Sequence, residues 1–141
     1  MSETGVSALE HSIQETDIWL KAIQKELHLE NRPHAYNALR AVLHALRDRL
    51  VPESAVHFGA QLPIVVRGIY YEGWHMSGKP TGERSVQEFA DKVAKELPPK
   101  FAMDPLTVTR GVFAALSKEM DEGAMAKVVQ QMPEPLRQLW P

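Results

Sequence analysis

Apolar side chains recur along most of the chain at intervals of three or four residues, which is the spacing of an amphipathic helix rather than of a strand. The first stripe consists of Leu9, Ile13, Leu20, Ile23 and Leu27. Two starts are open for this helix, because Ser7 to Glu10 matches a capping box while Thr16 would equally cap a shorter helix. A clearer capping box, Ser85 to Glu88, opens a later stripe that Pro98 and Pro99 end.

Two longer stripes predict the central helices of the fold. One begins near Pro33 and runs to Leu50. The other begins at Asp104 and Pro105, a favoured pair for a helix start, and runs to Met120. Both carry a wide apolar face, so we expect them to pack at the centre of the core.

Short helices are expected next, over residues 52–61 and 121–131, where acidic residues lie at the positive end of the helix dipole. The segment 62–71 is ambiguous, because its β-branched and aromatic residues are also typical of a buried strand. Its counterpart, residues 132–140, contains prolines that would remove hydrogen-bond donors from a strand but suit the first turn of a helix. We therefore predict a short helix for both segments.

The second half of the chain repeats the first at an interval of 70 residues. Identical residues at this interval include Lys25/Lys95, Glu26/Glu96, Leu27/Leu97, Arg40/Arg110, Val42/Val112, Gln61/Gln131, Pro63/Pro133 and Arg67/Arg137. We predict one all-α domain, residues 1–141, with about eight helices in two four-helix repeats. The repeats span about 16–71 and 85–141, and a polar linker rich in glycine, residues 72–84, joins them. Packing about a two-fold axis and packing in layers are both open.

Composition narrows the classes of partner. Sixteen basic and 18 acidic residues give a net charge of −2 with both signs interspersed, so we expect no nucleic-acid partner. No uninterrupted apolar run is long enough to cross a membrane, and the N-terminal residues do not resemble a secretory signal. The absence of cysteine fits a reducing compartment, and we expect a cytoplasmic protein.

Few residues suggest catalysis. The stretch Gly73 to Pro80 has the glycine and lysine spacing of a phosphate-binding loop, but Pro80 stands where that loop needs a serine or threonine for magnesium. The six histidines lack the spacing of metal ligands, and there is no activated serine motif and no cysteine. We therefore predict no catalytic residue, no metal and no cofactor.

Three polar pairs are retained between the two halves, and they are the candidate ligand-binding residues: Arg40, Arg110, Gln61, Gln131, Arg67 and Arg137. One interpretation is structural, because arginine can bond the free carbonyls at the end of a neighbouring helix and glutamine can satisfy a helix junction. The alternative is that the arginines converge on an anion, which guanidinium groups bind well. Trp74 and Trp140 are candidate exposed anchors for a protein partner.

Several segments resemble a known family. These are Ala41 to Leu50, Ala60 to Pro63, Arg67 to Tyr71, and Gly73 with Trp74. Together they resemble the bacterial domain of unknown function 2267, and the likeness extends from about Thr16 to Trp140. The resemblance implies an all-helical fold and a bacterial origin, but no catalytic residues or cofactor.

Two functions follow as expectations. The first is a non-enzymatic module that acts through protein-protein contact, with a partner protein or as a homo-oligomer, since helical faces can present grooves to a partner. The alternative is a protein or enzyme that binds a small anionic ligand in a pocket between the two halves.

Overall fold

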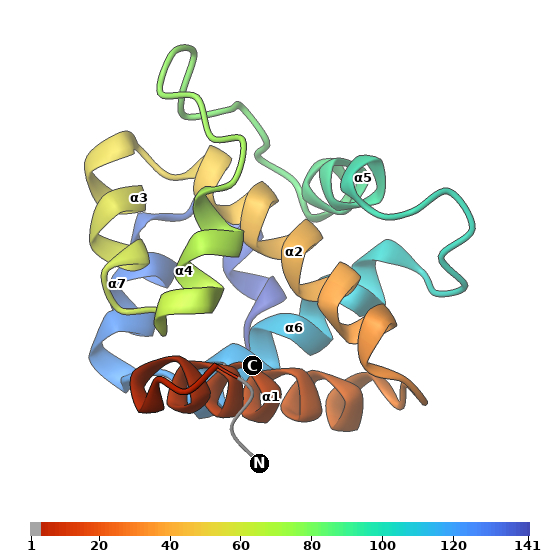
Figure 1. Ribbon diagram of the computed structural model, residues 1–141. Helices are drawn as coiled ribbons and strands as arrows, with labels where there is room; N and C mark the ends of the chain where they lie inside the picture. The colour runs from red at the N-terminus through yellow and green to blue at the C-terminus, as the bar shows by residue number, and fades with distance from the viewer. Residues whose placement is uncertain (1–3) are drawn as a thin grey trace.

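The computed structural model describes residues 4–141, which form seven α-helices and a terminal 3-10 helix and contain no strand (Figure 1). In chain order these are α1 (Ser7–Leu27), α2 (Arg32–Arg49), α3 (Pro52–Gly59), α4 (Ile64–Tyr71), α5 (Val86–Glu96), α6 (Pro105–Glu119), α7 (Glu122–Gln131) and η1 (Glu134–Leu139). The all-α class and the expected number of helices are confirmed. Residues 1–3 of the predicted domain lie outside the described part.

Side-chain caps begin several of these helices. Ser85 and Glu88 form both bonds of the predicted capping box at the start of α5. Asp104 accepts a hydrogen bond from the Thr107 amide at 3.2 Å, and Pro105 is the first residue of α6, as predicted. The segment that could have been a strand is helix α4, so that prediction is also confirmed.

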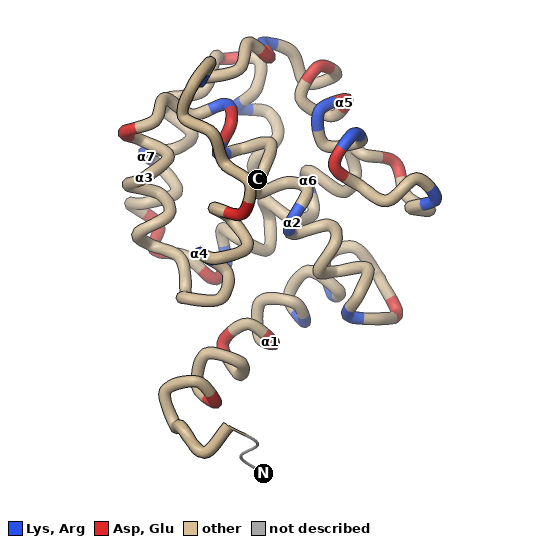
Figure 2. Tube along the Cα trace, turned by 45° about the horizontal axis from the view of Figure 1, so that its top comes forward, with Lys and Arg blue, Asp and Glu red and all other residues tan. Residues whose placement is uncertain are grey.

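Helix α1 corrects two expectations at its N-terminus. It begins at Ser7 with Val6 as its N-cap and no side-chain cap, so the longer of the two helices forms but the expected Ser7 capping box does not. Its apolar stripe also divides, because Leu9 and Ile13 are exposed whereas Ile23 is buried. The first turns of α1 project beyond the other helices (Figure 2), and Ile13 lines a groove beside α4, so only the second half of the stripe reaches the core.

The core lies around α2 and α6, whose apolar faces are almost entirely buried, as their long stripes predict. The first two helices of each half of the chain pack against helices of the other half. Helix α1 packs on α6 and α5 packs on α2, while α2 meets α6 and α3 meets α7 (Figure 1). This arrangement is compatible with the 70-residue repeat, which stays a prediction.

Helices α1 and α6 cross closely because Gly111 has no side chain. A Cβ atom added at Gly111 would lie 2.8 Å from Cγ of Leu27 and still closer to one of its methyl groups. Leu27 is itself buried, so it has little room to move. Glycine at this position therefore sets how near α1 approaches α6.

We predict that Gly111→Ala lowers the free energy of unfolding by about 1–3 kcal/mol, since overpacking outweighs the better helix propensity of alanine. Gly68→Ala is the matched control, because Gly68 is also helical and nothing lies within 4 Å of its added Cβ. The free energy of unfolding of Gly68→Ala should be up to about 1 kcal/mol higher than that of the parent protein. Urea unfolding measures both. Equal effects of the two changes would contradict the close crossing. When the Leu27 side chain is removed as well, Gly111→Ala should lower the free energy of unfolding by less.

Candidate functional site

Arg67 and Arg137 hold backbone carbonyls at the ends of the preceding helices. The Arg67 guanidinium donates to the Gly59 carbonyl at 3.1 Å, to that of Ala60 at 3.3 Å and to that of Leu62 at 2.9 Å. Arg137 donates to the Gln130 carbonyl at 3.1 Å and to the Met132 carbonyl at 3.2 Å. Both guanidinium groups thus make the helix-end contacts of the structural interpretation, at the ends of α3 and α7.

Arg40 and Arg110 lie apart from that arrangement. Arg40 is half-buried, and its Nε lies 3.1 Å from a carboxylate oxygen of Glu72. Arg110 is exposed, and no ion pair within the described residues includes it. Neither side chain lines the pocket that contains the glutamine pair, so the retained arginines do not form one common group there.

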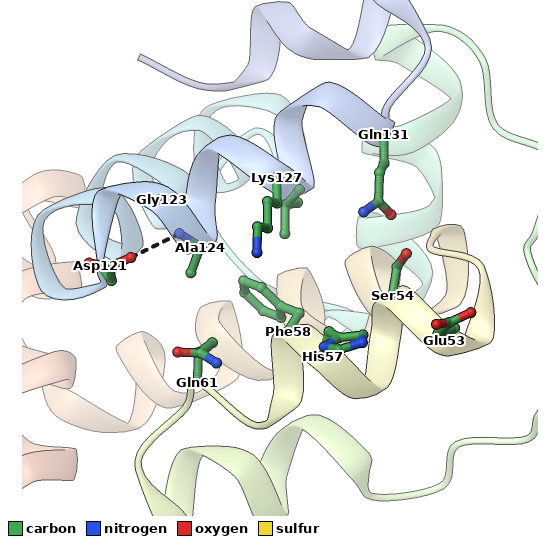
Figure 3. Close-up of a pocket in the computed structure, with 11 residues that line it drawn as sticks. Glu53, Ser54, His57, Phe58, Gln61, Asp121, Gly123, Ala124, Lys127 and Gln131 are labelled. Carbon is green, nitrogen blue, oxygen red and sulfur yellow. Dashed lines mark hydrogen bonds between the residues drawn. The ribbon is translucent and has the colours of Figure 1, made fainter.

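Gln61 and Gln131 line the same cleft between α3 and α7, at its two ends (Figure 3). The cleft has a volume of about 480 Å³ and a floor that includes Phe58 and Val128. The two helices run in opposite directions in this view, so Gln131 lies across from Ser54 near the start of α3. Gln61 lies at the other end of the cleft, nearer the start of α7.

Charged side chains surround the same cleft. Lys127 projects from α7 toward Phe58, and His57 lies next to Phe58 on α3 (Figure 3). Glu53 and Asp121 lie at the starts of the two helices, and Asp121 accepts the Ala124 amide at 3.1 Å as the cap of α7. The cleft therefore combines one lysine, one histidine, two carboxylates and two amides over an apolar floor.

The two candidate tryptophan anchors differ in exposure. Trp140 is buried, contrary to the expectation of an exposed anchor, because its ring stacks on Phe113 with centroids 4.0 Å apart and its Nε1 donates to Met125 Sδ. Trp74 is half-buried and packs 5.7 Å from the Tyr71 ring. Its Nε1 is buried and has no hydrogen-bond acceptor among the described residues. Trp140 thus belongs to the core.

A buried polar cluster joins α2 to the end of α4, and its central residue is His44. The His44 Nε2 donates to the Ile69 carbonyl at 2.7 Å, since a carbonyl oxygen can only accept. Nδ1 lies 3.7 Å from a carboxylate oxygen of Glu96 on α5. Burial lowers the pKa of His44 below its ordinary value; the Arg47 and Arg40 charges lower it further, whereas the Ile69 bond and Glu96 act in the opposite direction. Burial therefore disfavours the protonated form of His44.

Arg47 and Asp48 complete this cluster. Arg47 donates to the carbonyls of Tyr70 at 2.7 Å and Glu72 at 2.6 Å, which fixes the end of α4. It also donates to the Asp48 carboxylate at 3.1 Å, and Lys92 of α5 lies 3.4 Å from the other Asp48 oxygen. The buried charges are thus paired with one another or with carbonyls. Sequence spacing did not reveal the cluster, because the three α2 residues bind partners on α4 and α5 that lie far away in the chain.

The loop after α4 is attached to α2 as well. Arg49 donates to the Glu83 carbonyl at 2.6 Å, and the Thr81 amide donates to the Asp48 carbonyl at 2.8 Å. Arg47, Asp48 and Arg49 have no identical counterparts in the second half, where Ser117, Lys118 and Glu119 stand. Their contacts account for that difference, because they bind the connection that follows α4.

Comparison with known proteins identifies the chain at the level of family. Residues 16–139 match the family described as an uncharacterized conserved protein (DUF2267). The chain belongs to this family. Its resemblance to that family is therefore confirmed, while a bacterial origin stays a prediction. No curated protein matches the DUF2267 chain.

A second surface of the DUF2267 chain is apolar. A groove of about 320 Å³ lies between α1 and α4, and the side chains that line it include Ile13, Leu20 and Val65. Leu9 and Ile64 are exposed on the same two helices. Residues 7–15 of α1 precede the matched segment, so the family match does not cover one end of this surface.

No group of three or more potential metal-ligating side chains was found within residues 4–141. Across the same residues, no helix combines the length and the apolar character needed to span a bilayer.

We predict that Arg67→Ala lowers the free energy of unfolding by about 1–3 kcal/mol, because it removes the donors that satisfy carbonyls at the end of α3. Arg67→Lys should recover part of the loss, since one ammonium group cannot reach all three acceptors. Arg110 is exposed and has no ion pair among residues 4–141, so Arg110→Ala should change the free energy of unfolding by less than about 0.5 kcal/mol. Urea unfolding tests the series; an Arg67→Ala effect as small as that of Arg110→Ala would refute the carbonyl-capping role.

We also predict that acid destabilises the fold through His44. Because the pKa of His44 is lower in the folded state, the unfolded chain takes up this proton first, and stability falls as pH falls through about 6.5. Protonation of His44 lowers the free energy of unfolding by at most about 1.4 kcal/mol for each pH unit. His44→Gln keeps an amide donor for Ile69 but cannot take up a proton. Its melting temperature should fall less than that of the parent protein between about pH 7.5 and 5.5; an unchanged slope would rule out His44 as the source.

Proposed function

We propose that this protein is an interaction module that binds an amphipathic helix of a partner protein in the groove between α1 and α4. The observation that carries the proposal is the apolar surface formed jointly by the two helices. Leu9 and Ile13 of α1 are exposed, as are Ile64 and Val65 of α4, and the groove separates the two helices. Exposed apolar residues gathered in one place are typical of a protein interaction site.

The dimensions of the groove favour a helical ligand. Its volume of about 320 Å³ is at the lower limit of small-molecule pockets, and its lining combines the apolar Ile13, Leu20 and Val65 with three polar residues of α1, which are Gln14, Thr16 and Asp17. An amphipathic helix binds such a groove with anchors three or four residues apart. Large side chains of the partner would occupy the groove, and the exposed Leu9 and Ile64 would extend the contact at its edges.

Charge favours a basic helix as the partner. Residues 4–20 contain Glu10, Glu15 and Asp17 but no lysine or arginine, and Figure 2 shows acidic residues alone along the first half of α1. Asp17 is paired with Arg32 and Lys21, and Glu15 lies 3.6 Å from His11, but no lysine or arginine lies within residues 4–20, so the segment carries a net negative charge. A second copy of this chain would bring the same acidic segment, which favours a different protein over a homo-oligomer.

The proposal is tested with two synthetic amphipathic helices, one of leucine and lysine and one of leucine and glutamate. Fluorescence anisotropy should show saturable binding of the lysine peptide, weakening as salt is raised, and little binding of the glutamate peptide. Ile13→Asn should weaken the binding of the lysine peptide by about ten-fold or more, because it places a polar group in the groove.

Ile18→Asn provides the matched control. Ile13 and Ile18 lie on the same helix and are each 55% exposed, but only Ile13 lines the groove. Ile18→Asn should therefore change the affinity less than about two-fold. Equal losses in the two variants would show that the peptide binds elsewhere, and no saturable binding of either peptide would overturn the proposed function.

A further inference from the structure

We infer that the cleft between α3 and α7 binds a small organic monoanion, a carboxylate with a flat apolar body, with its head group at Lys127. This site is separate from the α1/α4 groove and does not depend on the proposed function. It is formed by one helix from each half of the chain, and its volume of about 480 Å³ lies within the usual range for small-molecule sites.

The floor of the cleft suits an apolar ligand body. Phe58 and Val128 are buried beneath it, one from each helix, and the Phe58 ring lies at its centre (Figure 3). A flat ligand could cover this floor and displace water from apolar surface, which contributes favourable free energy. The polar groups around the rim would then orient the head group rather than supply most of the affinity.

The polar side chains of the cleft are available to a ligand. Within the described residues, no side-chain hydrogen bond or ion pair engages Lys127, His57, Ser54, Gln61 or Gln131. This differs from the neighbouring Arg67 and Arg137, whose guanidinium groups are bonded to carbonyls. Because those arginines hold the ends of α3 and α7, the two glutamines extend from helix ends that are already fixed. Such preorganisation lowers the entropic cost of binding.

The charges of the cleft limit the charge of the ligand. Lys127 provides one positive charge beside the apolar floor, and Gln131 offers an amide donor on the same helix. Glu53 and Asp121 place a carboxylate at each end of the cleft. A second negative charge on the ligand would be repelled by them, so the arrangement favours a carboxylate over a phosphate dianion.

Benzoate is a suitable probe, because it combines one carboxylate with a flat ring. Titration of the full chain, followed by backbone amide NMR, should give saturable shifts confined to α3, α7 and the adjoining η1. The dissociation constant should be on the order of 1 mM for so small a ligand. Benzyl alcohol, which lacks the charge, and phenyl phosphate, which is largely dianionic at neutral pH, should each bind at least several-fold more weakly.

Lys127→Ala should weaken benzoate binding about ten-fold, whereas Lys95→Ala should leave it unchanged. Lys95 is an exposed lysine of α5 that lies outside the cleft, and both substitutions change the net charge by one unit. Gln131→Ala should produce a smaller loss than Lys127→Ala. The inference is overturned if benzoate gives no saturable shifts, if the shifts lie outside α3, α7 and η1, or if the two lysine variants behave alike.

Discussion

Carbonyl oxygens at helix ends are the constraint on which much of this structure depends. Every helix leaves its last four carbonyls without intrahelical partners, and a fold of short helices contains many such ends. The eight-residue helix α4 illustrates the solution, because Arg47 and His44 of α2 donate to the carbonyls of Ile69, Tyr70 and Glu72 at its end. Buried side chains of the central helix thereby replace the water that these carbonyls would otherwise bind.

The same constraint explains why one polar pair, Arg67 and Arg137, is retained at the 70-residue interval. Arg67 and Arg137 make corresponding bonds to carbonyls five and seven residues before them. An arginine can satisfy several acceptors at once because its donors are arranged in a rigid fork. Retention of these residue types therefore has a physical reason in the helix ends, and the ends so fixed define the shape of the α3/α7 cleft.

Local sequence rules predicted much of the fold. Apolar periodicity located the helices, and short-range capping rules identified the starts of α5 and α6. Comparison with residues 132–140 correctly made residues 62–71 helical despite their β-branched composition. Periodicity alone, however, assigned Leu9 and Ile13 to the same stripe as Ile23. Whether a helical face is covered depends on where the neighbouring helices end, and the sequence pattern of α1 contains no information on that.

The site was less predictable, because its groups meet only through tertiary packing. Gln61 and Gln131 could be selected from the repeat, but Lys127 and His57 gave no sequence signal. The proximity of His44 on α2 to Glu96 on α5 was likewise not detectable from residue spacing. Trp140 lies at the penultimate position, yet it is buried because Phe113 and Met125 provide a matching surface.

The attachment of the long loop to α2 favours packing of the two halves of one chain on each other over their exchange between two molecules. Arg49 donates to the Glu83 carbonyl, and Ser85 caps α5. Only Arg84 therefore lies between this loop anchor, the Arg49–Glu83 bond, and the cap of the next helix. The chain therefore delivers α5 directly to the face of its own α2. Exchange of α5 and the following helices between two molecules would require that anchor to be released, so the loop acts as a barrier to domain swapping.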